Sequence, residues 1–395
     1  MKFNKWTVAL AAIGVVSLAS AARADEAAPT MNAVQTALSS TTLSGYVDVA
    51  ATWRPGTDQK ASNAPFPNIP AYSYAKNDGF SLNAVDIALD HPEDASPWAA
   101  GYHVEMMFGP DNPLGGYGYA NGIGALRQAY LTLRMPVGNG IDWKVGVFDT
   151  IIGYESTSDS LDPNYTRSYG YTIEPTTHTG VLATYKVNDM VSVSAGVANT
   201  WTETFFLIPT GPTYESQKTY MGSIAFTAPD SAGWMSGATL SLGVVNATDS
   251  GSGFFGGSQT SWYAGMTLPT PVKAMKVGMA FDWHDLHNSS AANPSDDSVW
   301  VIGLYSSLQA TDKLSLNLRG EYMGDNGAGP YGSAAEELTA TAQYNLWANV
   351  ISRLEFRWDH VEHGSFFGAS SGVTTNGDPN RGDDFLLALN LIYQF

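Results

Sequence analysis

The last twelve residues, Asp384 to Phe395, are the feature that most restricts how this chain can fold. One set of alternate positions is apolar without a break: Phe385, Leu387, Leu389, Leu391, Tyr393 and Phe395. Side chains of a strand point to opposite faces in turn, so this pattern predicts a strand with one continuous apolar face. At the free edge of a soluble sheet such a strand is a template for aggregation. In a closed transmembrane barrel the edge disappears, because the last strand pairs with the first.

The alternative for this segment is a half-buried strand of a secreted sandwich. The aromatic carboxy-terminal residue is similar to the end of the terminal strand in bacterial outer-membrane barrels. That resemblance implies that the strand is recognised by the barrel assembly machinery. It favours the barrel over the sandwich.

The amino terminus has the three parts of a secretory signal peptide. Lys2 and Lys5 precede an apolar run from about Thr7 to Ala19, and Ala22-Arg23-Ala24 provides small residues before a cleavage point. We expect residues 1–24 to be a signal peptide, residues 25–42 to form a short periplasmic lead, and residues 43–395 to form one domain. No other stretch approaches the roughly 18 apolar residues of a transmembrane helix.

The composition excludes several classes of protein. The chain has no cysteine, so it has neither disulfides nor thiol chemistry. Charged residues make up only 14%, aromatic residues 12%, and there are 40 glycines, which suits a barrel with a lipid-facing outside and a wet inside. The formal net charge of −18 becomes −21 when Lys2, Lys5 and Arg23 are removed. This balance argues against nucleic acid as a partner and biases a pore towards cations.

Strand-like segments alternate with connections along the mature chain, and about sixteen can be assigned. Each is about long enough to cross a bilayer on a tilt of about 45°. They lie near residues 43–53, 79–90, 98–109, 125–135, 141–150, 178–187, 190–200, 217–227, 238–246, 260–268, 273–284, 299–309, 312–322, 337–345, 350–359 and 384–395.

The connections alternate strictly between long and short. The short ones are rich in Pro, Asn, Asp and Gly, as tight turns are, whereas the longest connection covers residues 151–177. A soluble sandwich has no reason to segregate loop lengths in this way. We therefore predict an all-β fold: a transmembrane, antiparallel, up-and-down β-barrel of about 16 strands with short periplasmic turns and long extracellular loops.

The two faces of the predicted strands differ in charge. In residues 273–284, Met275, Val277 and Phe281 share one parity, whereas Lys276 and Asp282 share the other. A charge facing lipid at mid-bilayer costs roughly 2–4 kcal/mol, so the charged parity is expected to face the interior. Residues 299–309 are apolar on both faces, and the pattern does not assign their inner side.

One region resembles a known family. The motif runs through Gly146-Val-Phe-Asp-Thr-Ile-Ile-Gly-Tyr-Glu155, Asp162-Pro-Asn-Tyr-Thr-Arg-Ser-Tyr-Gly-Tyr171 and Ile173-Glu-Pro-Thr-Thr-His-Thr-Gly180. It looks like the OmpL-like outer-membrane beta-barrel porin family (beta-barrel porin-2 type), and Leu43-Ser-Gly-Tyr-Val-Asp48 is similar to that family's first strand. The resemblance implies a pore-forming protein of the bacterial outer membrane, with no catalytic residues and no defined substrate.

The long connection at residues 151–177 is the candidate constriction. A sixteen-stranded barrel is wide enough for an aqueous channel, so selectivity requires something folded inside it. By analogy with general porins, the third loop is expected to supply it; the alternative is that it caps the outer rim. The candidate constriction residues are Glu155, Asp159, Asp162, Arg167 and Glu174.

Charged residues of the predicted inner parity are the candidate pore lining. They are Glu105, Arg134, Lys144, Arg319, Glu321, Arg353, Glu355 and Arg357. The arginines are expected either to face the loop carboxylates across the pore and create a transverse field, or to neutralise neighbouring acids along the wall.

Metal binding and catalysis find little support. His284 with His287, and His360 with His363, flank acids at loop ends, but residues three apart on a strand point to opposite faces. No motif marks a nucleophilic serine. We expect no metal, no cofactor and no enzyme activity.

The sequence therefore predicts an outer-membrane porin for passive diffusion of small hydrophilic solutes or ions. Its expected partners are outer-membrane lipid and those solutes, without nucleic acid, and a homotrimer is expected by analogy. The alternatives are a substrate-specific channel, for example for sugars that stack on Tyr130, and a structural or partner-binding barrel without transport.

Overall fold

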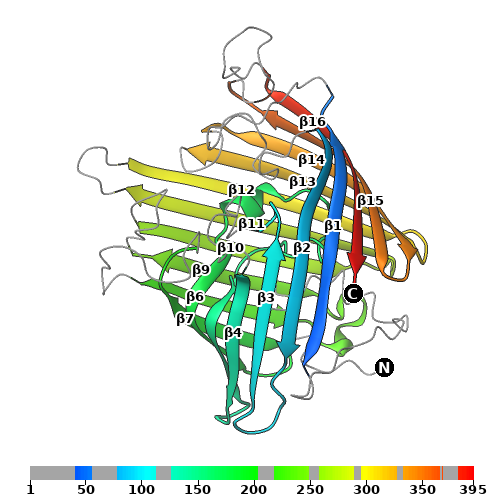
Figure 1. Cartoon of the computed structure of the whole chain (residues 1–395). Helices are drawn as coiled ribbons and strands as arrows, with labels where there is room; N and C mark the ends of the chain where they lie inside the picture. Colours follow the sequence, from blue (N-terminus) through cyan, green and yellow to red (C-terminus); the bar gives the residue numbers. More distant parts are fainter. Residues whose placement is uncertain are drawn as a thin grey trace.

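The sixteen strands close into one antiparallel barrel (Figure 1). The computed structural model describes residues 41–55, 78–112, 126–202, 218–248, 258–288, 295–326, 332–364, 367 and 381–395. The strands are β1 (Thr42–Trp53), β2 (Gly79–His91), β3 (Ala100–Phe108), β4 (Leu126–Met135), β5 (Ile141–Asp149), β6 (Thr177–Lys186), β7 (Val191–Ala198), β8 (Thr219–Thr227), β9 (Thr239–Ala247), β10 (Ser258–Pro269), β11 (Met275–Asn288), β12 (Ser295–Gln309), β13 (Leu314–Asn326), β14 (Ala335–Trp347), β15 (Val350–Val361) and β16 (Asp383–Gln394). The predicted fold class and strand number are confirmed.

The barrel closes between its first and last strands. β1 pairs with β16 in antiparallel register, from Tyr46 opposite Gln394 to Trp53 opposite Leu387. Two backbone hydrogen bonds of 3.0 Å join Gly45 and Phe395, each residue donating its N–H to the carbonyl of the other. No free edge is left at this seam, as the apolar terminal strand requires.

Alternation along β16 follows the predicted parity. Phe385, Leu387, Leu389 and Leu391 are exposed on the outside, whereas Leu386, Ala388 and Asn390 are buried inside. Similar outward apolar rows run along the neighbouring strands, for example Leu316 and Leu318 on β13. This is the surface that acyl chains require.

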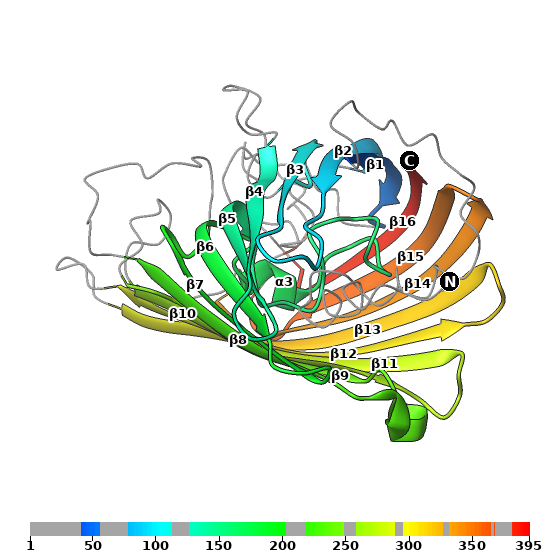
Figure 2. The ribbon, with the colours of Figure 1, turned by 90° about the horizontal axis from the view of Figure 1, so that it is seen from below.

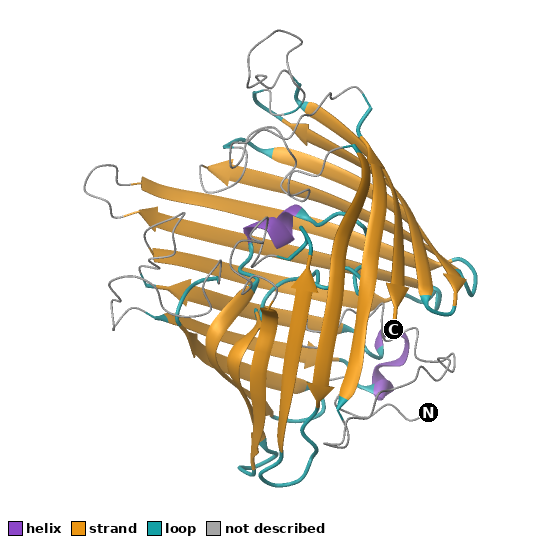
Figure 3. Ribbon diagram, in the orientation of Figure 1, coloured by secondary structure: helices purple, strands orange, loops and turns teal. Residues whose placement is uncertain are grey.

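In the described part of the chain, the helical segments η3 and α3 accompany the strands (Figure 3). The 3-10 helix η3 (Asp230–Met235) lies in the turn between β8 and β9. The α-helix α3 (Tyr169–Ile173) lies within the ring of strands in the connection between β5 and β6 (Figure 2). Among the described residues, no helix is long and apolar enough to cross a membrane. The signal peptide and most of the predicted lead lie outside the described residues.

The two-sided apolar character of residues 299–309 has a structural cause. Val299 and Val301 of β12 point inward and are fully buried against Tyr169 and Ile173 of α3. On the opposite face, Leu304 is 60% exposed. The inner face of β12 is apolar because the helix covers it, so water does not reach it.

The lipid-facing row of β16 gives a first prediction. Leu389→Lys places a charge on the outer face of a strand in the middle of the seam, and we expect it to destabilise the barrel by about 2–4 kcal/mol. Urea unfolding in lipid vesicles, followed by tryptophan fluorescence, measures the change. Val272→Lys is the control, because Val272 is exposed in the turn between β10 and β11. Equal effects of the two substitutions would contradict an outer face in contact with lipid.

Candidate functional site

The connection between β5 and β6, residues 150–176 and here called L3, runs through the barrel interior. Its hydrogen bonds reach strands far along the chain, such as the one from the Tyr165 N–H to Glu355 on β15, 190 residues away. The α3 helix within it contacts β11 and β12. Ser168 caps this helix, since its side chain accepts a hydrogen bond from the Tyr171 N–H. L3 therefore packs against the inner wall, and the alternative of a cap on the outer rim does not describe it.

Acidic side chains of the barrel wall accept hydrogen bonds from the backbone amides of L3. Glu321 on β13 accepts from the Tyr169 N–H at 2.5 Å, at the start of α3. Glu355 accepts from the amides of Tyr165 and Thr166 at 2.6 and 2.9 Å. The two wall acids thus bind an irregular segment of backbone that has no sheet partner.

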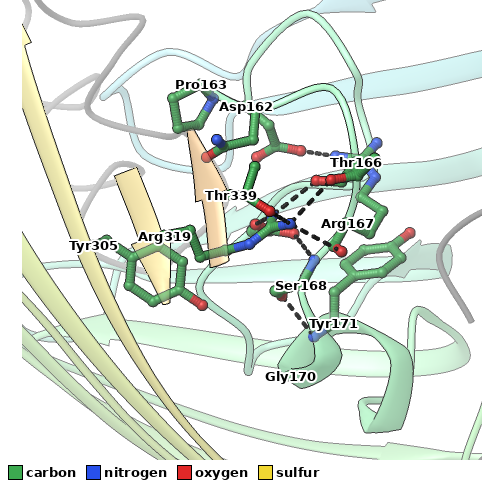
Figure 4. Close-up of polar contacts among 12 residues, drawn as sticks. Asp162, Pro163, Thr166, Arg167, Ser168, Gly170, Tyr171, Tyr305, Arg319 and Thr339 are labelled. Atoms are coloured by element: carbon green, nitrogen blue, oxygen red, sulfur yellow. Dashed lines mark hydrogen bonds and ion pairs between the residues drawn. The ribbon is translucent and has the colours of Figure 1, made fainter. Parts of the chain in front are cut away.

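Arginines of the same wall donate hydrogen bonds to carbonyls and carboxylates of L3. Arg319 Nη1 donates to Glu155 Oε1 at 2.6 Å and to the Thr166 carbonyl at 2.7 Å, while its Nε donates to Glu337 at 2.8 Å (Figure 4). Glu155 in turn accepts from the Ser168 N–H at 2.8 Å. Arg319 is therefore bound on one side to the wall and on the other to L3.

Arg353 and Arg357 act in the same way. Arg353 Nη2 donates to the carbonyls of Asp159, at 2.9 Å, and Asp162. Arg357 donates to the Arg167 carbonyl at 2.5 Å and to Asp359 on its own strand at 2.7 Å. Along with Arg319, these side chains are at most 1% exposed. The two expected arrangements are combined: the arginines touch both L3 and wall acids, and no water-filled gap separates them from L3.

The predicted constriction residues hold L3 in shape. Arg167 forms ion pairs with Asp159, at 2.5 Å, and with Asp162, and its guanidinium lies 5.1 Å from the centre of the Tyr171 ring. Asp162 also accepts from the Ser156 N–H at 2.9 Å. These groups are buried. Their direct contact with a passing solute stays a prediction.

Glu174, the fifth residue, lies in a different environment. Its carboxyl donates a hydrogen bond to Asp282 on β11, and Glu155 and Glu321 lie nearby. Burial and the neighbouring acids, chiefly Asp282, raise the pKa of Glu174 well above its usual value. Two buried carboxyl groups in contact share a proton more readily than they both ionise. Glu174 therefore fixes the end of α3 in its protonated form.

The first residues of L3 attach by apolar contact. Ile151 and Ile152 pack on Leu182, Met221 and Val245, which point inward from β6, β8 and β9. The Tyr154 ring stacks on Tyr305 with centroids 4.0 Å apart. The inner wall of the barrel is therefore apolar where L3 begins, polar along the middle of L3, and apolar again on β12 where α3 packs.

The remaining predicted pore-lining residues lie on β3–β5, outside this contact region. Glu105 accepts from Arg127 Nε at 2.7 Å. Arg134 pairs with Asp142 at 2.6 Å. The Lys144 ammonium lies 4.6 Å from the centre of the Tyr130 ring. Their role as pore lining is a prediction that the geometry leaves open.

Arg127 was missed by the sequence pattern. Strand alternation cannot place both Arg127 and Gln128 inside, yet both are buried. The cause is a register shift in the pairing of β3 with β4 between Glu105 and Met106. Two consecutive polar residues before an alternating run would have been the signal. Among the described residues, no cluster of three His, Asp or Glu could hold a metal ion.

Comparison with known sequences identifies the family. A sequence profile of the family described as "Putative beta-barrel porin-2, OmpL-like" matches residues 40–395. The chain belongs to this porin family. This membership confirms the predicted resemblance and the predicted outer-membrane location. A search of curated proteins finds no significant match.

Solved structures share the fold of this porin at low sequence identity. The anion-selective porin from Comamonas acidovorans has a TM-score of 0.62 at 13% identity, over 90% of this chain and 99% of that one. The outer membrane channel DcaP of Acinetobacter baumannii has a TM-score of 0.61 at 13% identity, over 90% and 97%. The trimer form of OmpT from Vibrio cholerae has a TM-score of 0.57 at 12% identity, over 90% and 99%. These likenesses show the barrel fold.

Removal of Arg319 should release L3. Arg319→Gln leaves Glu155 buried without its cation and leaves Glu337 only its contact with Arg357 at 3.6 Å. Breaking a buried pair in this way costs about 3–5 kcal/mol. We expect faster hydrogen exchange at the amides of Thr166 and Tyr169, while the strands stay protected. Lys313→Gln, in the exposed turn between β12 and β13, is the control. Unchanged protection of L3 would show that Arg319 does not hold it.

Raising the pH should also loosen L3. Because the pKa of Glu174 is raised in the folded protein, the native state binds its proton more tightly than the unfolded chain does. The free energy that holds L3 in place therefore falls as the pH rises above the ordinary glutamate pKa. The equilibrium constant for the opening of L3 rises by at most about tenfold per pH unit. Hydrogen exchange corrected for intrinsic rates measures this slope. Glu174→Gln should flatten this slope, whereas Asp189→Asn, at the exposed rim, should leave it unchanged. An equal slope in all three proteins would exclude Glu174 as the group whose titration loosens L3.

Proposed function

We propose that this porin lets small hydrophilic solutes and ions diffuse passively across the outer membrane, through a passage that L3 narrows. A sixteen-stranded barrel encloses an aqueous channel unless something fills it. The observation that supports the proposal most strongly is the contact of L3 with the wall through Arg319, Arg353 and Arg357. A loop held by three buried cations is a fixed obstruction, so size and charge select the solutes.

In this proposal, L3 is the constriction, and Glu155, Asp159, Asp162 and Arg167 maintain its shape. Each of them is bonded within L3 or to the wall. Substituting them would therefore change the passage by moving the backbone of L3.

General diffusion is favoured over a sugar-specific site by the surroundings of Tyr130. The His103 ring stacks on Tyr130 with centroids 5.2 Å apart, and the Lys144 ammonium also lies over the ring. A sugar that stacks on an aromatic ring needs a free face. Tyr130 is instead occupied by its own neighbours on the wall.

We also propose no enzyme activity. The pair that most resembles a nucleophile and its base is Ser261 with His284, 3.2 Å apart. Trp201 donates a hydrogen bond to the same serine oxygen at 2.9 Å, and its ring packs edge-on against His284. These contacts fix Ser261 in a buried polar network. Loss of a lipid or peptide hydrolase activity in Ser261→Ala would contradict this part of the proposal.

The mature chain is proposed to begin at Asp25 and to assemble into a homotrimer. The signal-peptide pattern of residues 1–24 supports the first point, and the similarity to OmpT of Vibrio cholerae, solved in a trimer form, supports the second. Mass spectrometry of the protein from outer membranes and native electrophoresis without heating test them separately.

Planar-bilayer recording tests the channel itself. We expect an ohmic conductance that increases with salt concentration and is unaffected by added sugars, because His103 and Lys144 already lie against the Tyr130 ring. Arg319→Gln should make single-channel currents noisier and variable, since L3 is released, whereas Lys313→Gln should behave as the unmodified protein. Saturable block by a sugar would support the substrate-specific alternative. Inserted protein that carries no current would support a structural barrel.

A further inference from the structure

The wall of β2–β5 lies across the barrel from β11–β13 (Figure 2), and the acid–base pairs on it are asymmetric in exposure. Arg127 is 4% exposed, whereas its partner Asp149 is 20% exposed. Arg134 is 9% exposed, whereas its partner Asp142 is 19% exposed. In both pairs the guanidinium is packed into the wall and the carboxylate is turned towards water.

A third pair on this wall repeats the asymmetry. Asp90 accepts from His103 Nδ1 at 3.2 Å, and the aspartate side chain is 44% exposed against 17% for the histidine. Glu105 contacts the other ring nitrogen of His103 and is itself buried. The three partly exposed acids, Asp90, Asp142 and Asp149, are called the carboxylate row. It runs from the ends of β2 and β5 nearest the short turns to the residue where L3 begins.

Each acid of this row is paired with the less exposed base named above, and the other cations of the interior lie elsewhere. Arg319, Arg353 and Arg357 are buried beneath L3, bonded to its carbonyls and to wall acids. Within the described part of the chain, Lys144 is the cation of the β2–β5 wall that forms no ion pair. Its ammonium lies over the Tyr130 ring.

Building on the proposed channel function, we propose that this porin prefers cations, and that its solutes are small cations or molecules that carry a positive group. The carboxylate row supplies the charge that such solutes meet, because in its three pairs the acid is the more exposed partner. Clefts lined by one sign of charge concentrate ions of the opposite sign. The buried arginines do not reverse this preference, since L3 and the wall acids compensate them.

The zero-current potential in a potassium chloride gradient measures the preference. We expect the sign that indicates cation permeation in the unmodified porin. Asp90→Asn should lower the permeability ratio of potassium to chloride by about twofold, as expected for one charge at several ångströms in water. Lys144→Gln should raise the ratio, which makes the two variants opposite in sign. Asp230→Asn, exposed in η3 outside the inner wall, is the matched control and should leave the ratio unchanged.

Several results would overturn the inference. Anion preference in the unmodified porin would exclude it while leaving the channel function intact. A ratio that does not change in Asp90→Asn, with normal conductance and a folded barrel, would show that the carboxylate row does not face the ions. Absence of current in every protein would contradict the channel function itself, and the inference with it.

Discussion

A polar group that leaves water must find a partner or cost free energy, and this constraint governs the interior of the barrel. L3 brings into the barrel a stretch of backbone that belongs to no sheet. Glu321 and Glu355 accept hydrogen bonds from its amides, and its carbonyls accept hydrogen bonds from Arg353 and Arg357. An irregular segment needs acceptors for its amides and donors for its carbonyls. The acids of the wall supply the acceptors, and its arginines supply the donors. The alternating signs along β13–β15 therefore correspond to alternating donors and acceptors of L3.

L3 combines two kinds of adhesion that complement each other. Ile151 and Ile152 contribute non-directional apolar burial on β6–β9, which fixes where the loop enters the interior. The charged contacts further along are directional, so they fix conformation. An apolar attachment alone would allow L3 to slide, and polar contacts alone would repay little beyond their own desolvation.

The sequence predicted what depends on local pattern. Strand number, closure and the outward rows follow from period-two alternation, and β16 shows it from Asp383 to Tyr393. It could not predict what depends on contacts between distant residues. The sequence pattern around Arg353 is the same whether its guanidinium faces water or donates to the Asp159 carbonyl. Only the folded chain shows that it binds the carbonyl. Val299 and Val301 were unassigned for the same reason, because α3 is what makes their side of the wall dry.

The separation in sequence between L3 and its binding surface has a consequence for biogenesis. Hydrogen bonds from Tyr169, Tyr165 and Arg353 to their partners span 152, 190 and 194 residues. Contacts of such long range form late and slowly. Until β13–β15 are in the sheet, L3 lacks these partners, so the interior takes its final shape only late in the assembly of the barrel.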